Sequence, residues 1–220
     1  MIIHKLDLPA LTVERSEVAR LLGYPPGPMP RRVMEVVADA ETNAASLIHP
    51  VGAYALTGRA TLAASGYLRD VGRAALCVVS IGGALERRVD AYRAGGLLGP
   101  ALILDACGSA AAEAAADAAE VVVRAALERD AVRCSRRFSP GYGGWDVAEQ
   151  RWLLGVLRAH EIGVTLTEGC MMAPRKSVSF AMTVGENPIE FFDDDICASC
   201  GAVDCRWRDT PHKCPGRQTR

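Results

Sequence analysis

The alternation of hydrophobic and polar positions divides the chain into helical and extended segments. Apolar residues that recur every three or four positions predict helices, and short apolar runs between turn residues predict strands. Helices are expected at 15–22, 31–48, between the glycine pairs 82–83 and 95–96, at 99–129 and at 146–159. Strands are expected at 2–8, 51–56, 75–81, 132–138, 162–167 and 177–184.

The segment 75–81 is apolar throughout, which predicts a central strand of the sheet. Helices combined with short, non-alternating strands favour an α+β domain with an antiparallel or mixed sheet. No glycine-rich turn follows the first strand, so a dinucleotide-binding βαβ fold is not expected.

The helix expected at 146–159 carries a strong start signal. Asp146 stands at the N-cap position and Glu149 follows three residues later. This is a capping-box arrangement with Asp in place of Ser or Thr, in which the two side chains bond backbone N–H groups reciprocally.

Composition narrows the class of protein. Half of the 220 residues are hydrophobic but only 5% are aromatic, so we expect a core of small aliphatic side chains and closely packed helices. The formal net charge of −1 gives no indication of nucleic-acid binding. The most apolar long stretch, 97–127, is interrupted by charged residues, and the N-terminus lacks an apolar signal core. We therefore expect a cytoplasmic protein that does not span a membrane.

Two turns rich in glycine and proline flank the helix at 146–159, and the first spans 136–144. Pro140-Gly141 favours a turn, and Gly143-Gly144 lets a ligand approach the backbone closely. Arg137 can hold a carboxylate through two parallel hydrogen bonds, and Tyr142 offers a flat face and a hydroxyl. The alternative is an ordinary strand-to-helix turn with solvated arginines.

The second turn spans 166–177, where Met171-Met172 can line an apolar ligand face because methionine adapts to irregular shapes. The alternative is a hairpin whose methionines fill the core. A nearly bare helix segment, 108–112, permits close approach by a helix or a ligand, and the carboxylate of Glu113 follows it. The alternative is tight helix packing with a solvated Glu113 at the rim.

Cysteines crowd into the end of the chain, where a metal site is more typical of a cytoplasmic protein than disulfides are. The expected ligands are Cys197, Cys200, Cys205 and Cys214. A Cys-x-x-Cys pair places two thiolates on one metal, and the two later cysteines can complete four-coordination. The spacing matches neither the common zinc ribbon nor the bacterial ferredoxin run. Zinc and a 4Fe–4S cluster both stay open, as do His212 as a substitute ligand and a tail without metal.

Several classes of chemistry lack their sequence signals. The chain has no phosphate-binding Gly-x4-Gly-Lys-Ser/Thr loop, no Gly-x-Ser-x-Gly turn and no His-Glu-x-x-His motif, and its four histidines do not cluster. Hydrolytic chemistry is therefore not expected.

Taken in order, three of these segments resemble one family, the activation domain of vitamin B12-dependent methionine synthase. They are the small-residue helix at 108–117, the Arg137-Phe138-Ser139-Pro140-Gly141-Tyr142 turn, and the stretch 166–179 with its Leu-Thr-Glu start and Ser-Val-Ser end. The similarity spans roughly 70–192. It implies a curved α+β domain with a twisted, mainly antiparallel sheet flanked by helices. Residues 1–195 would form this domain, with a helical part at about 1–48, and 196–220 the metal-binding tail.

The family resemblance also implies residue roles. Arg137 would hold the methionine carboxylate of S-adenosylmethionine, with Glu113 nearby and the backbone of Gly141, Gly143 and Gly144 completing the site. Tyr142 and Met172 would face the cobalamin, and Trp145, where the chain departs from the family, would offer it a new stacking face. The chain departs from the family at Gly143-Gly144-Trp145, where it has one residue fewer, and at Phe191-Phe192, where the family often has tyrosines.

The resemblance implies a repair function. The chain would bind S-adenosylmethionine and present its methyl group to an oxidised cobalamin on a methionine synthase, or on another corrinoid protein. A flavodoxin or a ferredoxin-type donor would supply one electron, unless a redox cluster in the tail delivers it. The alternatives are a non-catalytic corrinoid-protein binding module with a structural zinc tail, and an ATP-driven activator, which the missing phosphate loop disfavours.

Overall fold

The computed structural model of the chain describes residues 1–24, 30–129 and 132–191. Its centre is a five-stranded sheet with the order β1-β2-β3-β7-β4, in which each neighbouring pair is antiparallel. The strands are β1 (Ile3–Leu6), β2 (Val51–Gly58), β3 (Arg73–Ser80), β7 (Ser177–Gly185) and β4 (Arg133–Cys134). The α+β class and the central place of β3 are both confirmed.

Both faces of β3 are covered, which explains why its sequence does not alternate. One face, with Ala75, Cys77 and Val79, packs against the long helices. The other face, with Leu76 and Val78, packs in a second core. The sheet is therefore the middle layer of three.

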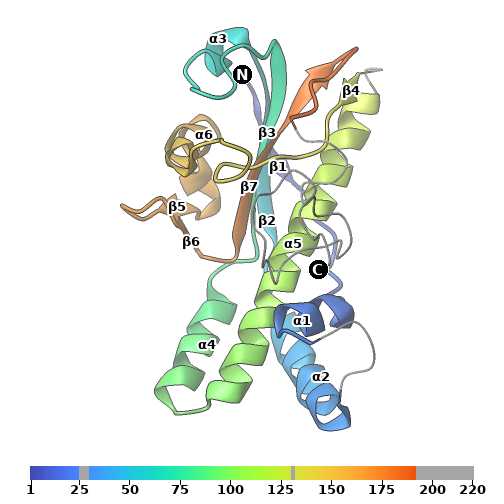
Figure 1. Cartoon of the computed structure of the whole chain (residues 1–220), viewed down its shortest axis with the longest axis vertical. Coiled ribbons are helices and arrows are strands. Elements are labelled where there is room, and N and C mark those ends of the chain that lie inside the picture. The colour runs from blue at the N-terminus through green and yellow to red at the C-terminus, as the bar shows by residue number, and fades with distance from the viewer. Residues whose placement is uncertain (25–29, 130–131, 192–220) are drawn as a thin grey trace, which may run out of the picture.

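The first outer layer consists of helices only. It contains α1 (Arg15–Leu21), α2 (Arg31–Ala45), α4 (Ala84–Ala94) and α5 (Leu98–Glu128). Helix α5 runs the length of the sheet, and the ends of α4 and α5 extend beyond it (Figure 1). Close packing depends on small residues, since a Cβ at Gly108 would lie 2.5 Å from the Leu85 side chain. No helix of the described part is long and apolar enough to cross a membrane.

The second outer layer is shorter and less regular. It contains α3 (Arg59–Leu62), the 3₁₀ turn η1 (Val147–Glu149), α6 (Gln150–Val156) and η2 (Ala159–Ile162). A separate hairpin joins β5 (Thr165–Leu166) to β6 (Met172–Ala173). Figure 1 shows α6 and this hairpin on the opposite side of the sheet from α5.

Three expectations about local structure need correction. The strand expected at 132–138 stops at Cys134, because the Ser135 hydroxyl accepts the Thr183 N–H at 2.9 Å, where a ladder would use a backbone carbonyl. The helix expected at 146–159 is split into η1, α6 and η2, and Arg158 has a left-handed backbone between the last two. Asp146 caps the Ala148 N–H at 2.8 Å as predicted, whereas the Glu149 carboxylate bonds elsewhere.

Candidate functional site

Arg137 lies where the chain leaves β4 and crosses beside β7. Two backbone hydrogen bonds between Phe138 and Ala181, of 3.0 and 2.8 Å, hold this crossing in place. Phe138 belongs to the core on the α6 side. The neighbouring Arg137 lies over Phe180, with its guanidinium carbon 5.9 Å from the ring centroid, on the α5 side. Strand-like alternation therefore directs the guanidinium toward α5.

A row of carboxylates on α5 receives that guanidinium. Arg137 Nη1 lies 2.5 Å from Asp117 and 3.6 Å from Glu120, and Nη2 lies 3.2 Å from Glu113. The three acids recur at helical spacing, so they lie on one face of α5. The Arg137 side chain is only 24% exposed. Its charge is therefore balanced within the protein.

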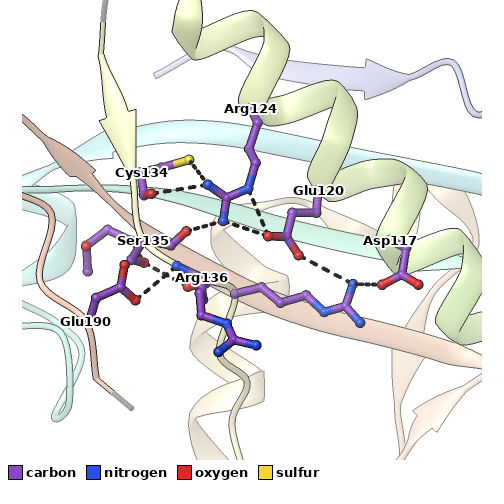
Figure 2. Close-up of polar contacts among 9 residues, drawn as sticks. Asp117, Glu120, Arg124, Cys134, Ser135, Arg136 and Glu190 are labelled. Carbon is purple, nitrogen blue, oxygen red and sulfur yellow. Dashed lines mark hydrogen bonds and ion pairs between the residues drawn. The ribbon is translucent and has the colours of Figure 1, made fainter. Parts of the chain in front are cut away.

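A second arginine fixes this crossing from the side. Arg124 donates to Glu120 at 2.7 and 2.9 Å, and to the carbonyl oxygens of Ser135 and Cys134 at 2.6 and 3.2 Å. Figure 2 shows Asp117, Glu120 and Arg124 projecting from α5 toward this segment. On its other side, the Arg136 N–H donates to Glu190 at 3.1 Å.

Two hollows meet in front of these residues. The smaller, of about 400 Å³, is lined by Glu113, Arg137, Phe138, Ser139, Pro140, Tyr142, Gln150, Met172, Ser177, Val178 and Ser179. The larger, of about 890 Å³, lies between α1 and α5. Glu113 and Tyr142 line both. Their volumes fall within the range of small-molecule sites.

Electrostatically, Glu113 is the unusual acid of the site. Burial raises the pKa of its carboxyl, Arg137 opposes this rise, and Asp117 and Glu17 add to it. Glu113 therefore carries its negative charge less readily than an ordinary surface glutamate.

The loop 139–146 turns back on itself. Gly141, Gly143 and Gly144 all adopt positive φ, at 95°, 55° and 83°, a conformation that side chains disfavour. The Gly141 N–H donates to the Trp145 carbonyl at 2.7 Å, so it is already used. None of the three glycines is among the lining residues of either hollow. Tyr142, at the tip, lines both hollows and is 64% exposed.

Trp145 is placed differently from the expectation. It is 1% exposed, stacks on Tyr67 with ring centroids 5.4 Å apart, and also contacts Phe138. A side chain buried this far offers no face to a cobalamin on another protein, so that assignment is wrong in this structure. Trp145 instead anchors the loop to the core. Met172 is half-buried and lines the smaller hollow.

A polar brace that sequence reasoning missed holds the same loop. Glu149 accepts hydrogen bonds from Trp145 Nε1 at 2.9 Å and from the Ser65 hydroxyl at 2.5 Å. Tyr67 donates from its hydroxyl to the Gly143 carbonyl at 3.2 Å. Segment 65–67 carries no motif that points to this role, and the capping-box pattern assigned Glu149 to another partner.

The expected metal ligands Cys197, Cys200, Cys205 and Cys214 lie outside the described residues. Within the described residues there is no group of three or more His, Cys, Asp or Glu side chains suited to a metal ion. The four cysteines that are described are free thiols. Burial raises the pKa of Cys107 to about 11 and that of Cys77 further still.

Comparison with known proteins identifies the fold. No family model and no curated protein matches the sequence. Among solved structures, the chain is similar to the crystal structure of the MetH reactivation domain bound to AdoHcy, with a TM-score of 0.64. The two share 16% identity over 83% of this chain and 78% of that one. At this identity the likeness establishes a shared fold and leaves function to be argued from the site.

Proposed function

We propose that this protein binds S-adenosylmethionine between α5 and the 139–146 loop and uses it in the reactivation of a corrinoid protein. One observation carries the proposal. A single hollow is lined by three residues that separate sequence motifs had indicated, Arg137, Glu113 and Tyr142. The chain shares its fold with a domain that was crystallised with AdoHcy.

The charges of the site suit this ligand. S-adenosylmethionine carries a carboxylate, an ammonium and a sulfonium, so its net charge is positive. The smaller hollow offers the Arg137 guanidinium for the carboxylate, and a guanidinium binds a carboxylate through a planar pair of hydrogen bonds. The adjoining larger hollow adds Glu14, Glu17 and Asp117 to the carboxylate of Glu113. Its one lining arginine among the described residues, Arg20, pairs with Glu17, so the lining is negative on balance and favours the two cationic groups.

A ligand carboxylate must share Arg137 with the carboxylates of the protein. Asp117 and Glu120 both contact Nη1, whereas Glu113 contacts Nη2 at 3.2 Å from the cavity side. Because Asp117 does not line the smaller hollow, a ligand there meets Glu113 first. We therefore expect the ligand carboxylate to replace Glu113 on Nη2, while Asp117 keeps the guanidinium in place.

The work of this chain is to bind and orient. The corrinoid of the partner supplies the cobalt atom that accepts the methyl group. A separate donor, such as a flavodoxin or a ferredoxin, supplies the one electron that the oxidised cobalamin needs. Transfer of a methyl group from a sulfonium needs alignment and exclusion of water more than proton transfer. The exposed Tyr142 ring lies at the mouth of both hollows, where the partner would approach. The cysteine tail would hold zinc or an iron–sulfur cluster.

Calorimetric titration tests the binding step. We expect S-adenosylmethionine to bind the parent chain at one saturable site and the Arg137→Ala variant to lose that binding. Arg158→Ala is the matched control, because Arg158 lines neither hollow and its ion pair among the described contacts is with Glu161. Absence of binding to the parent would favour the non-catalytic corrinoid-binding module.

A spectroscopic assay tests the reaction. The probe is a cobalamin-loaded methionine synthase without its own reactivation domain, mixed with this protein, S-adenosylmethionine and a one-electron reductant. We expect the methylcobalamin spectrum and one equivalent of S-adenosylhomocysteine. Binding of S-adenosylmethionine without either product would contradict the reactivation function.

A further inference from the structure

Gln150 is a buried polar side chain without a partner. It opens α6 and is 8% exposed. Its amide oxygen Oε1 is buried and accepts no hydrogen bond from any described residue. Buried amides normally find partners, because an unsatisfied one destabilises the folded state. The neighbouring Leu153 and Leu154 show that the core beside α6 accepts leucine. Packing alone therefore does not call for glutamine at this position.

Gln150 lines the smaller hollow, and this location supplies a reason for the missing partner. The hollow has two chemically distinct walls. The wall from α5 and Arg137 is charged, whereas Phe138, Pro140 and Met172 give the other wall an apolar character. Gln150 is the amide within this second wall, since α6 packs in the core of Phe138 and Met172.

We propose that Gln150 recognises the adenine of the ligand, with its amide oxygen accepting a hydrogen bond from the exocyclic amino group. This inference rests on the proposed function. An amide presents an acceptor beside a donor, which is the pattern that glutamine uses to pair with the edge of adenine. An apolar wall suits the flat faces of a purine. The charged wall is left for the amino-acid end of the same molecule.

Two other donors of the ligand are alternatives for the same amide. The α-ammonium group has a better partner in the carboxylate of Glu113, which carries charge. A ribose hydroxyl has alternative partners in the hydroxyls of Ser177 and Ser179, which line the same hollow. The experiment separates all three donors.

The test compares two variants that each remove a buried, unpartnered polar atom. Gln150→Leu removes the amide in the hollow. Thr57→Val removes Thr57 Oγ1, which is equally buried and unpartnered but lies in β2, away from both hollows. Neither variant is expected to lower the melting temperature without ligand. Only Gln150→Leu is expected to weaken S-adenosylhomocysteine binding, by roughly tenfold, the usual effect of losing one hydrogen bond.

Three ligands then locate the donor in calorimetric titrations. They are S-adenosylhomocysteine, its analogue with hydrogen in place of the 6-amino group, and 5′-methylthioadenosine, which lacks the amino acid. We expect the Gln150→Leu penalty to persist with 5′-methylthioadenosine and to vanish with the analogue.

A penalty that vanishes with 5′-methylthioadenosine but persists with the analogue would assign Gln150 to the ammonium group, and a penalty that persists with both ligands would assign it to the ribose. Either result overturns the adenine assignment. Unchanged affinity in Gln150→Leu, with normal binding by the parent, overturns the inference alone. If the parent binds none of the three ligands, the proposed function fails.

Discussion

The two walls of the smaller hollow solve the problem of buried polarity in opposite ways. On the α5 wall, the Arg137 guanidinium is paired with the carboxylates of Glu113, Asp117 and Glu120. On the α6 wall, the amide oxygen of Gln150 has no partner among the described residues. A ligand must therefore exchange partners with the first wall but can add a bond to the second. The charged groups of the first wall have partners without a ligand, whereas the amide oxygen of the second wall would gain its partner from a ligand.

The brace behind the α6 wall is where the largest loss of stability is expected. Glu149→Leu leaves the Trp145 indole N–H and the Ser65 hydroxyl without their acceptor in a buried place. We expect a loss of roughly 3 kcal/mol in the free energy of unfolding, and a melting temperature lower by about 6–12 °C. Thermal unfolding followed by circular dichroism measures this change.

Glu161→Ala serves as the control for Glu149→Leu, because its exposed pair with Arg158 should contribute little. A Glu149→Leu variant as stable as this control would show that the brace does not hold the loop.

The α5 wall should respond to pH through Glu113. Its pKa is raised, first by burial, with Asp117 and Glu17 adding to the rise and Arg137 and Arg20 opposing it. A group whose folded-state pKa exceeds its unfolded value contributes stability at low pH, and this contribution is lost as the pH rises through the folded pKa. Glutamine cannot ionise, so the Glu113→Gln variant does not lose stability through ionisation at this position as the pH rises.

We therefore expect Glu113→Gln to gain melting temperature relative to the parent as the pH rises from about 4 to 7, and to match it at the acidic end. The gain should be small, since the Glu113 side chain is 56% exposed and water screens its charge. Thermal melts across this pH range measure the difference. If Glu113→Gln instead loses stability relative to the parent as the pH rises, the pKa of Glu113 is lowered by folding rather than raised.

Asp117→Asn is the smallest perturbation of the same wall. Asp117 makes the shortest contact with Arg137, but its side chain is 70% exposed. We expect less than about 1 kcal/mol of lost stability, which is typical of an exposed ion pair. Because Asp117 does not line the smaller hollow, S-adenosylmethionine affinity should change less than in Glu113→Gln. If both variants change the affinity for S-adenosylmethionine equally, the α5 wall affects binding only through its total charge.

Local patterns were enough to predict the regular core. The apolar run at β3 and the bare helix segment of α5 predicted a covered central strand and close helix packing, and both are present. Arg137 was identified from its turn, and the structure places it against α5 as part of a hollow with Glu113. The domain boundary at 195 and the metal in the tail stay predictions.

The failures at the site involve partners far away in the sequence. Comparison with the family pattern predicts that Trp145 faces the cobalamin, but Tyr67 stacks on it in the core. Glu149 follows the capping pattern, yet a hydroxyl 84 positions away takes its carboxylate. Gln150 resembles an ordinary polar residue at a helix start, and its place in a hollow lined by Pro140 and Met172 depends on segments that are separate in the sequence.

Binding of S-adenosylmethionine at Arg137 is tested most directly by calorimetry on the ligand-free chain, with the Arg137→Ala and Arg158→Ala variants alongside. We expect one saturable site in the parent and in Arg158→Ala, and loss of that site in Arg137→Ala. Binding that survives unchanged without the Arg137 guanidinium, or no binding by the parent, would contradict this expectation.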